Sequence, residues 1–387
     1  MTRAGACAAV VIGACIALAL TVCAPAANAL RSVAGAGELL NYQRVDDPDF
    51  AMPGAGTVYS VQYNSRGADG RLTPVRGTVW FPTAAAPATG YPVVAAGHGT
   101  SGLGDECTLP RAFASAGPSY GPYYGPWLKQ GFVLVAPEYA GIGGPGVHPY
   151  LDRRVAGANM IDAVRAARQL GDRVGVDVDG RFATTGGSQG GHASLSAGDV
   201  AAEYAPELTL LGTTAVAPPV YIDRYLSLLG PHIPAVPVPD YVTYLSYVLR
   251  GLQASRPGLD VNAYLTPVGR TMLRAAETLC YPDMVARSRG LGVGDILAEP
   301  LHSGPLMAAV RDVQVIPASG FTRPILIHQG IADVTAFSPL TDQFVADVRA
   351  AGTRVDYRTS MAGHGVGPQA EVQSAQWARS LWRADVG

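Results

Sequence analysis

The sequence predicts an α/β fold, a mostly parallel sheet with helices on both faces and an inserted helical cap. First, short apolar runs alternate with helical stretches, as in sheets that are buried on both faces. Second, a Gly-x-Ser-x-Gly motif at 186–190 stands between a strand-like run and a helical run. Third, the alternation stops near Pro218 and resumes near residue 320. We therefore expect residues 30–217 and 320–387 to form the core and residues 218–319 to form the cap.

The individual elements follow from their apolar patterns. Residues 58–63 and 72–81 alternate apolar and polar side chains around a Gly-rich turn, which predicts an antiparallel pair. Continuous apolar runs predict buried strands at 92–96, 132–136, 181–185, 208–217 and 324–328, with a further strand at 355–358. Helical spacing predicts helices at 152–170, 192–204, 339–350 and 369–382.

The predicted cap is rich in Tyr and Leu and is interrupted by prolines. Apolar and aromatic side chains recur at helical spacing in 221–229 and 241–252. Such stripes either line a site for an apolar substrate or pack the cap onto the sheet. The sequence does not separate these two interpretations.

The N-terminal residues 1–29 have the features of a secretory signal. Arg3 supplies the positive charge, residues 8–20 form the apolar stretch, and Ala27 to Ala29 form a small-residue cleavage site. We expect cleavage after Ala29 and a secreted or cell-envelope-associated protein. An uncleaved anchor and lipid attachment at Cys23 are the alternatives.

Cleavage would leave two cysteines, Cys107 and Cys280. In an exported protein two cysteines predict one disulfide, with a pair of buried thiols as the alternative.

Composition argues against several classes of function. With 28 basic and 30 acidic residues, the chain gives no sign of nucleic-acid binding. The seven histidines are scattered and no Cys-x-x-Cys occurs, so no metal is expected. No Gly-x-Gly-x-x-Gly opens a helix after the first strands, so we expect no dinucleotide and no other cofactor.

Ser188 is the predicted nucleophile. A serine on a tight turn between strand and helix projects its Oγ clear of the sheet, and Gly186 and Gly190 allow the two elements to approach closely. Ser119 lies in a second Gly-x-Ser-x-Gly match, but no strand precedes it. Prolines at 122 and 126 are expected to break any helix after it, so we interpret that segment as a loop.

Two residues fit the partners that a serine nucleophile needs. Asp333 follows the apolar run at 324–328, just past the predicted strand end, and His364 stands between glycines after the next strand. We assign His364 as the general acid and base and Asp333 as the group that orients its imidazole. Asp342 is a poorer candidate because it lies inside a predicted helix.

The two other histidines near these segments are expected to have supporting roles. His192 lies one helical turn after Ser188, and His328 lies at a strand end. We expect His192 to support the site and His328 to pack.

The oxyanion of a tetrahedral intermediate needs hydrogen-bond donors. We expect one from the backbone N–H of Gln189 and another from the loop at 97–102, with Thr100 preferred and Gly99 second. A plain Gly-rich turn is the alternative for that loop.

On these residues the chain resembles the secretory lipase family of fungi and bacteria, which are α/β-hydrolases with a helical cap. The resemblance runs from about Asp46 to the C-terminus. It rests on the segments 53–57, 98–100, 137–143 and 148–151, and on the loops that carry Asp333 and His364. It also rests on the Gly-x-Ser-x-Gly turn at 186–190, which we call the elbow. It implies an exported lipase or esterase that acts on carboxylic esters and whose cap shapes the acyl site. As a further partner we expect transient contact with a lipid interface. Gly187 departs from the aromatic residue that often precedes the serine, so acyl preference stays open.

The predicted function is therefore serine ester hydrolysis, with a small-molecule or lipid ester as substrate. An acyltransferase would use the same three residues. A prolyl-type peptidase is disfavoured because the cap shows no obvious acidic pair. A non-catalytic binding protein is disfavoured because all three residues are present. The sequence does not predict an oligomeric state.

Overall fold

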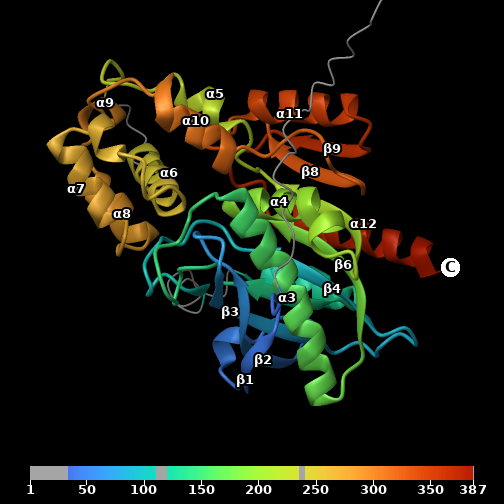
Figure 1. The fold of residues 1–387 in the computed structure, drawn as a ribbon. Helices are drawn as coiled ribbons and strands as arrows, with labels where there is room; N and C mark the ends of the chain where they lie inside the picture. The colour runs from blue at the N-terminus through green and yellow to red at the C-terminus, as the bar shows by residue number, and fades with distance from the viewer. Residues whose placement is uncertain (1–33, 110–119, 235–239, 387) are drawn as a thin grey trace, which may run out of the picture.

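The computed structural model describes residues 34–109, 120–234 and 240–386 (Figure 1). The predicted signal at 1–29 and the alternative nucleophile Ser119 lie outside these ranges. No helix within them combines the length and the apolar character that are needed to cross a membrane.

A single twisted sheet organises the described part of the chain. Its nine strands are β1 (Leu39–Arg44), β2 (Ala55–Arg66), β3 (Leu72–Pro82), β4 (Tyr91–Gly97), β5 (Val133–Pro137), β6 (Val178–Gly186), β7 (Thr209–Val216), β8 (Ile325–Gly330) and β9 (Val355–Ser360). Their order is β1-β2-β3-β5-β4-β6-β7-β8-β9. The pairs from β1 to β5 are antiparallel, and β5-β4 and all later pairs are parallel. The predicted mostly parallel sheet is confirmed.

Helices cover both faces of this sheet. They are α2 (Gly121–Lys129), α3 (Arg153–Val174), α4 (Gln189–Tyr204), α11 (Ser338–Ala350) and α12 (Gln369–Val386). Strand β4 shows the division, since Val93 and Ala95 pack in the cluster that contains α3 and α4. Val94 and Ala96 pack in the cluster that contains α2 and α12. This alternation explains why the strand reads as a continuous apolar run.

Two elements differ from the sequence prediction. Strand β1 was not predicted because it lies at the sheet edge and most of its side chains are exposed, so it carries no apolar alternation. The expectation that prolines prevent a helix after residue 120 is wrong. Pro122 lies in the first helical turn of α2, where its missing N–H costs no helical bond. Pro126 removes one bond inside the helix, and burial of Trp127 and Leu128 offsets it.

The chain between β7 and β8 is a helical insert. Its helices are α5 (Ile222–Leu226), α6 (Asp240–Ser255), α7 (Pro267–Ala275), α8 (Tyr281–Ser288), α9 (Val293–Ile296) and α10 (Gly304–Val313), with a 3-10 turn at Val261–Tyr264. Figure 1 shows α6 to α9 gathered at one end of the molecule. They share an apolar cluster of their own, which Tyr150 and Leu151 join from the core. The insert thus has its own core and a packed contact with the sheet domain.

A disulfide also joins the insert to the core. Cys107, in the segment after β4, bonds to Cys280 at the start of α8. Because 173 residues separate the two cysteines, the chain-entropy model assigns the cross-link about 5 kcal/mol of stabilisation.

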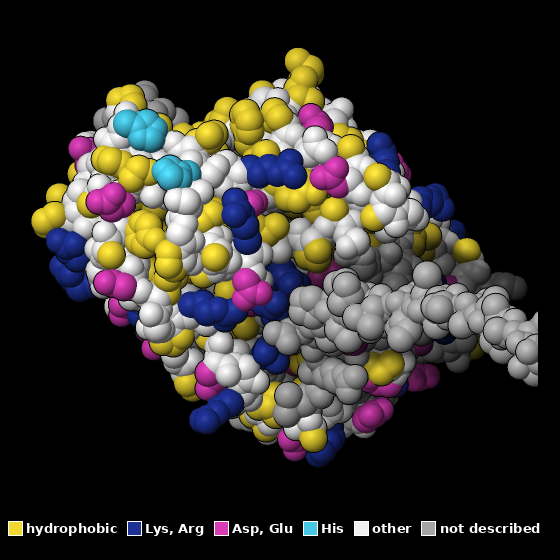
Figure 2. All heavy atoms as spheres, turned by 45° about the horizontal axis from the view of Figure 1, so that its top comes forward, with side chains coloured by type: hydrophobic (Ala, Val, Ile, Leu, Met, Phe, Trp, Pro, Cys, Tyr) yellow, Lys and Arg dark blue, Asp and Glu magenta, His cyan; other side chains and the backbone are white. Residues whose placement is uncertain are grey.

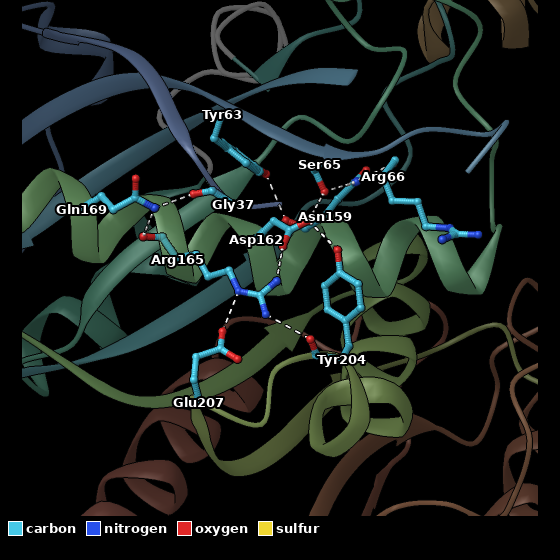
Figure 3. A network of polar contacts seen from close by, with 10 residues as sticks. All are labelled: Gly37, Tyr63, Ser65, Arg66, Asn159, Asp162, Arg165, Gln169, Tyr204 and Glu207. Carbon is cyan, nitrogen blue, oxygen red and sulfur yellow. Dashed lines mark hydrogen bonds and ion pairs between the residues drawn. The ribbon is translucent and has the colours of Figure 1, made fainter. Parts of the chain in front are cut away.

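A buried polar network holds α3 to its neighbours (Figure 3). The Asp162 carboxylate accepts hydrogen bonds from Ser65 on β2 (2.6 Å) and from Tyr204 on α4 (2.8 Å). Arg165 pairs with Asp162 at 2.7 Å and with Glu207 at 2.7 Å. Burial raises the pKa of Asp162, and its hydrogen bonds and Arg165 oppose that shift. The network therefore fixes the position of α4, the helix that begins immediately after Ser188.

Candidate active site

Ser188 occupies a strained turn between β6 and α4. Its φ of 54° and ψ of −120° are rare for a residue with a side chain. Two backbone hydrogen bonds hold this conformation, from the Ser188 N–H to the Val216 carbonyl (2.8 Å) and from the His192 N–H to the Ser188 carbonyl (3.0 Å). The turn therefore holds Ser188 at the carboxyl edge of the parallel strands, where open α/β sheets place their sites.

The glycines around Ser188 are required to different degrees. A Cβ added to Gly186 would lie 2.6 Å from the Gly97 carbonyl oxygen, and one added to Gly190 would overlap that same oxygen. A Cβ at Gly187 would meet only the Val216 carbonyl oxygen, at 3.9 Å. Close approach of β4, β6 and α4 thus demands glycine at 186 and 190 but leaves room for a side chain at 187.

The structure brings Ser188, His364 and Asp333 into one hydrogen-bonded row. The His364 Nε2 lies 2.9 Å from the Ser188 Oγ, and its Nδ1 lies 2.9 Å from the Asp333 Oδ2. Because a carboxylate only accepts, the His364 Nδ1–H donates to Asp333 and the Nε2 is left to accept the Ser188 proton. This is the arrangement that a general base needs.

Asp333 is buried, and strand β8 and the loop after it supply its other partners. Its Oδ1 accepts the N–H groups of Thr335 (2.8 Å) and Ala336 (3.0 Å), and its Oδ2 accepts Gln329 Nε2 (3.1 Å). Asp342, the alternative acid, lies on α11 and accepts a hydrogen bond from Tyr357 (2.6 Å) instead. The carboxylate is therefore held in a fixed direction toward His364.

The loops that carry Asp333 and His364 are also tied to each other. The Ile331 N–H donates to the Ser360 carbonyl (2.9 Å), and the Ala332 N–H donates to the Ala362 carbonyl (3.1 Å). These bonds continue the β8–β9 pairing beyond the strands. Asp333 and His364 are thereby fixed relative to one another.

Two hollows meet at Ser188 and His364, which line both. The first, of about 80 Å³, lies against the insert and is lined by apolar and aromatic side chains that include Tyr225, Leu245 and Val248. The second, of about 370 Å³, is lined by Gly99, by glycine backbone of the elbow, and by residues of α2. A larger crevice of about 840 Å³ between the β2–β3 turn and α6–α7 contains none of the three residues. Volume alone therefore does not identify the site.

Known proteins resemble this chain in sequence and in fold. Residues 124–299 match the family model described as secretory lipase. Lipase A of Candida antarctica in its closed state superposes with a TM-score of 0.69 at 17% identity, covering 88% of this chain and 83% of that one. The rice cell wall degrading esterase of Xanthomonas oryzae superposes with a TM-score of 0.72 at 18% identity, covering 89% and 96%. The fold is that of the α/β-hydrolases. The predicted resemblance to secretory lipases is confirmed.

Curated relatives match over part of their length. A probable inactive lipase of Mycobacterium tuberculosis is 28% identical over 244 residues, which cover 60% of this chain and 51% of the relative. Lipase A of Arthroderma benhamiae is 27% identical over 241 residues, which cover 60% and 49%. The chain therefore spans about half the length of the curated relatives it matches.

Of the predicted oxyanion donors, Gln189 and Gly99 lie beside Ser188, and Thr100 lies against Tyr150. Gln189 is the first residue of α4, and the backbone N–H groups of a first helical turn have no partner within the helix. Gly99 lines the larger of the two hollows at Ser188. The Thr100 hydroxyl bonds to the Tyr150 hydroxyl (2.6 Å), which anchors the loop on the insert side.

The segment that follows β5 braces the loop at 97–102 and the turn at Ser188. The Tyr139 hydroxyl donates to the His98 carbonyl (3.1 Å). His148 donates from Nδ1 to the Ala140 carbonyl (2.9 Å), which leaves its Nε2 to accept Gln189 Nε2 (2.9 Å). Burial lowers the pKa of His148 to about 3, so the ring is neutral and can accept. Sequence reasoning missed this contact, although His148 lies in the segment 148–151, one of those on which the family resemblance rests.

His192 and His328 take no part in the hydrogen bonds that join Ser188, His364 and Asp333. His192 bonds through Nε2 to the Gln314 carbonyl (2.9 Å), so it links α4 to the chain that follows α10. Burial lowers its pKa to about 4. His328 is buried in β8, and burial lowers its pKa to about 4 as well. Within the described ranges no group of three or more His, Cys, Asp or Glu residues is placed to hold a metal.

Proposed function

We propose that this chain is an exported serine hydrolase that cleaves carboxylic esters. One observation carries the proposal, namely that Ser188, His364 and Asp333 form a continuous hydrogen-bonded row at a strained turn. The match to secretory lipases and the likeness to lipase and esterase structures support ester hydrolysis as its chemistry.

The geometry supports a two-step acyl transfer. The Ser188 Oγ attacks the ester carbonyl carbon while its proton passes to His364 Nε2. Asp333 holds the imidazole and stabilises its charged form. Collapse of the tetrahedral intermediate breaks the bond to the alcohol oxygen, which takes the proton from His364. Water then attacks the acyl-serine by the same route and releases the acid.

The oxyanion is assigned to backbone donors. The Gln189 N–H and an amide of the 99–100 loop would bind the negative oxygen, and the α4 dipole would favour it. The bond between Gln189 and His148 supports this assignment, because it restrains the residue whose N–H is needed.

We assign the acyl chain to the hollow against the insert, and we take residues 218–319 as the cap. Some apolar side chains of α5 and α6 line this hollow, and others pack the insert. Tyr225, Leu245 and Val248 line the hollow, whereas Leu249 and Leu252 pack inside the insert. Typical ligand sites measure roughly 300–1,000 Å³. At about 80 Å³, this hollow supports a short acyl chain.

Exposed apolar side chains near the site support transient contact with a lipid interface. Val334 and Phe337 on the Asp333 loop are 54% and 46% exposed, and Met361 on the His364 loop is 83% exposed. On the face shown in Figure 2, hydrophobic side chains lie exposed between acidic and basic ones. A mixed surface of this kind suits a neutral ester droplet better than a charged polymer. The disulfide between Cys107 and Cys280 supports export, for which the sequence at 27–29 predicts cleavage after Ala29.

Labelling with a fluorophosphonate tests the proposed nucleophile directly. The reagent phosphonylates an activated serine and loses fluoride. We expect one label on the Ser188 peptide of the wild type, none in Ser188→Ala, and much slower labelling in His364→Ala. An unlabelled wild type would overturn the proposal and favour a non-catalytic protein, as the name of the mycobacterial relative suggests for that relative.

A further inference from the structure

The two hollows at Ser188 differ in what lines them. On the insert side the walls are aliphatic and aromatic side chains of the insert. On the other side the wall contains three tyrosines at the start of α2, Tyr120, Tyr123 and Tyr124, opposite the glycine backbone of β4 and the elbow. We call this second hollow the tyrosine cleft.

The reaction needs both hollows. The acyl and alcohol parts of an ester diverge from the carbonyl carbon that Ser188 attacks. The alcohol oxygen must also lie within reach of His364 Nε2, which protonates it as it leaves. Ser188 and His364 line both hollows, so one part of the ester can occupy each. The smaller, apolar hollow suits the acyl chain, which leaves the tyrosine cleft, at about 370 Å³, for the alcohol.

The tyrosine wall is rigid. The rings of Tyr120 and Tyr124 lie 5.3 Å apart, and Tyr124 packs edge-on against Trp80 at 6.0 Å. The N–H groups of Tyr123 and Tyr124 donate to the Tyr120 carbonyl (2.9 and 2.8 Å), which fixes the turn. Tyr123 remains 40% exposed and so offers its ring to a molecule in the cleft. Rigid aromatic faces contact ring-shaped molecules over a large area at little cost in entropy.

We infer that the tyrosine cleft binds the alcohol part of the ester and selects a ring-bearing alcohol over an open-chain one. The inference rests on the proposed function. It goes further by naming the class of alcohol. A ring is favoured because an open chain must lose rotational freedom to lie along a flat wall and a ring does not.

Two butyrate esters test this selection. Cyclohexylmethyl butyrate and n-heptyl butyrate carry the same acyl group, and both release a primary alcohol of seven carbons. We expect a severalfold higher kcat/KM for the cyclohexylmethyl ester in the wild type. In Tyr123→Ala the ratio should fall to about one, and in Tyr123→Phe it should persist because the ring remains.

Tyr42→Ala is the matched control. Tyr42 is also 40% exposed but lies on β1, outside the tyrosine cleft, so its loss should leave both rates unchanged. A wild-type ratio of one, or a preference that survives in Tyr123→Ala, overturns the inference while leaving ester hydrolysis intact. Failure to cleave either ester overturns the proposed function and this inference with it.

Discussion

The elbow around Ser188 and the helical insert that faces it are held in place by different means. The elbow depends on backbone contacts so close that Gly186 and Gly190 admit no Cβ, and on hydrogen bonds that hold a strained φ. The insert depends on many side chains that share one apolar cluster, on a disulfide, and on contacts with Tyr150 and Leu151. A single change at the elbow should therefore be decisive, whereas changes in the insert should be graded and alter which substrate fits.

Among variants that keep Ser188, His364 and Asp333, the largest effect is expected at Gly190. A Cβ there overlaps the Gly97 carbonyl oxygen, so Gly190→Ala must push α4 away from β4 and misplace Ser188. We expect ester hydrolysis to fall by at least a hundredfold, with a large loss of thermal stability. Gly187→Ala is the control, since its Cβ has room, and it should retain most activity. Equal behaviour of the two variants would remove the distinction between required and permitted glycines.

A graded effect is expected in the insert at Leu245, which lines the hollow that we assign to the acyl chain. Leu245→Ala should cost about 2–5 kcal/mol of unfolding free energy and shift the preferred ester toward longer acyl chains. Leu306→Ala truncates a buried leucine of the same cluster outside the hollow. It should cost a similar amount and leave the chain-length profile unchanged. The same shift in both variants would argue against the acyl assignment.

A pH-dependent effect is expected at Glu371, in the first turn of α12. Its carboxyl accepts hydrogen bonds from Trp127 (2.8 Å) and from Thr185 (3.1 Å), the latter three residues before Ser188. Burial raises its pKa from 4.5 to about 7, against these two hydrogen bonds. Its neutral form therefore stabilises the fold below pH 4.5, and that contribution is lost as the pH rises through 7.

Comparison with Glu371→Gln isolates this contribution. The unfolding free energy of wild type relative to the variant should fall by about 1.4 kcal/mol for each pH unit between 4.5 and 7. Denaturant melts at several pH values measure it. A difference that stays constant over this range would show that Glu371 does not titrate there.

The smallest effect is expected at the exposed rim of the site. Met361→Ser should lower the rate on emulsified tributyrin a few-fold and leave the rate on dissolved p-nitrophenyl acetate unchanged, because one apolar anchor is lost. Leu40→Ser, 44% exposed on β1, is the control. Equal losses on both substrates in Met361→Ser would argue against interfacial contact.

The sequence predicted what local patterns encode. The buried parallel strands left continuous apolar runs, the turn at Ser188 left its glycine spacing, and the helical insert interrupted the alternation of strands and helices. The convergence of Asp333 and His364 on Ser188 follows from strand ends that meet at one edge. Hydrogen bonds between polar side chains that are far apart in the sequence leave no such pattern in it. The bonds of His148 to Gln189 and of Glu371 to Thr185 join residues 41 and 186 positions apart. Helix α2 was not predicted because its stability comes from burying Trp127 against the sheet, which outweighs the local cost of Pro126.

Hydrolysis of a p-nitrophenyl ester series from acetate to palmitate, by wild type and by Ser188→Ala, is the decisive experiment for ester hydrolysis by Ser188. We expect activity that is greatest on short chains, falls toward palmitate, and drops by at least a thousandfold in the variant, because the nucleophile is lost. Wild type and variant that hydrolyse every ester at the same rate would contradict it.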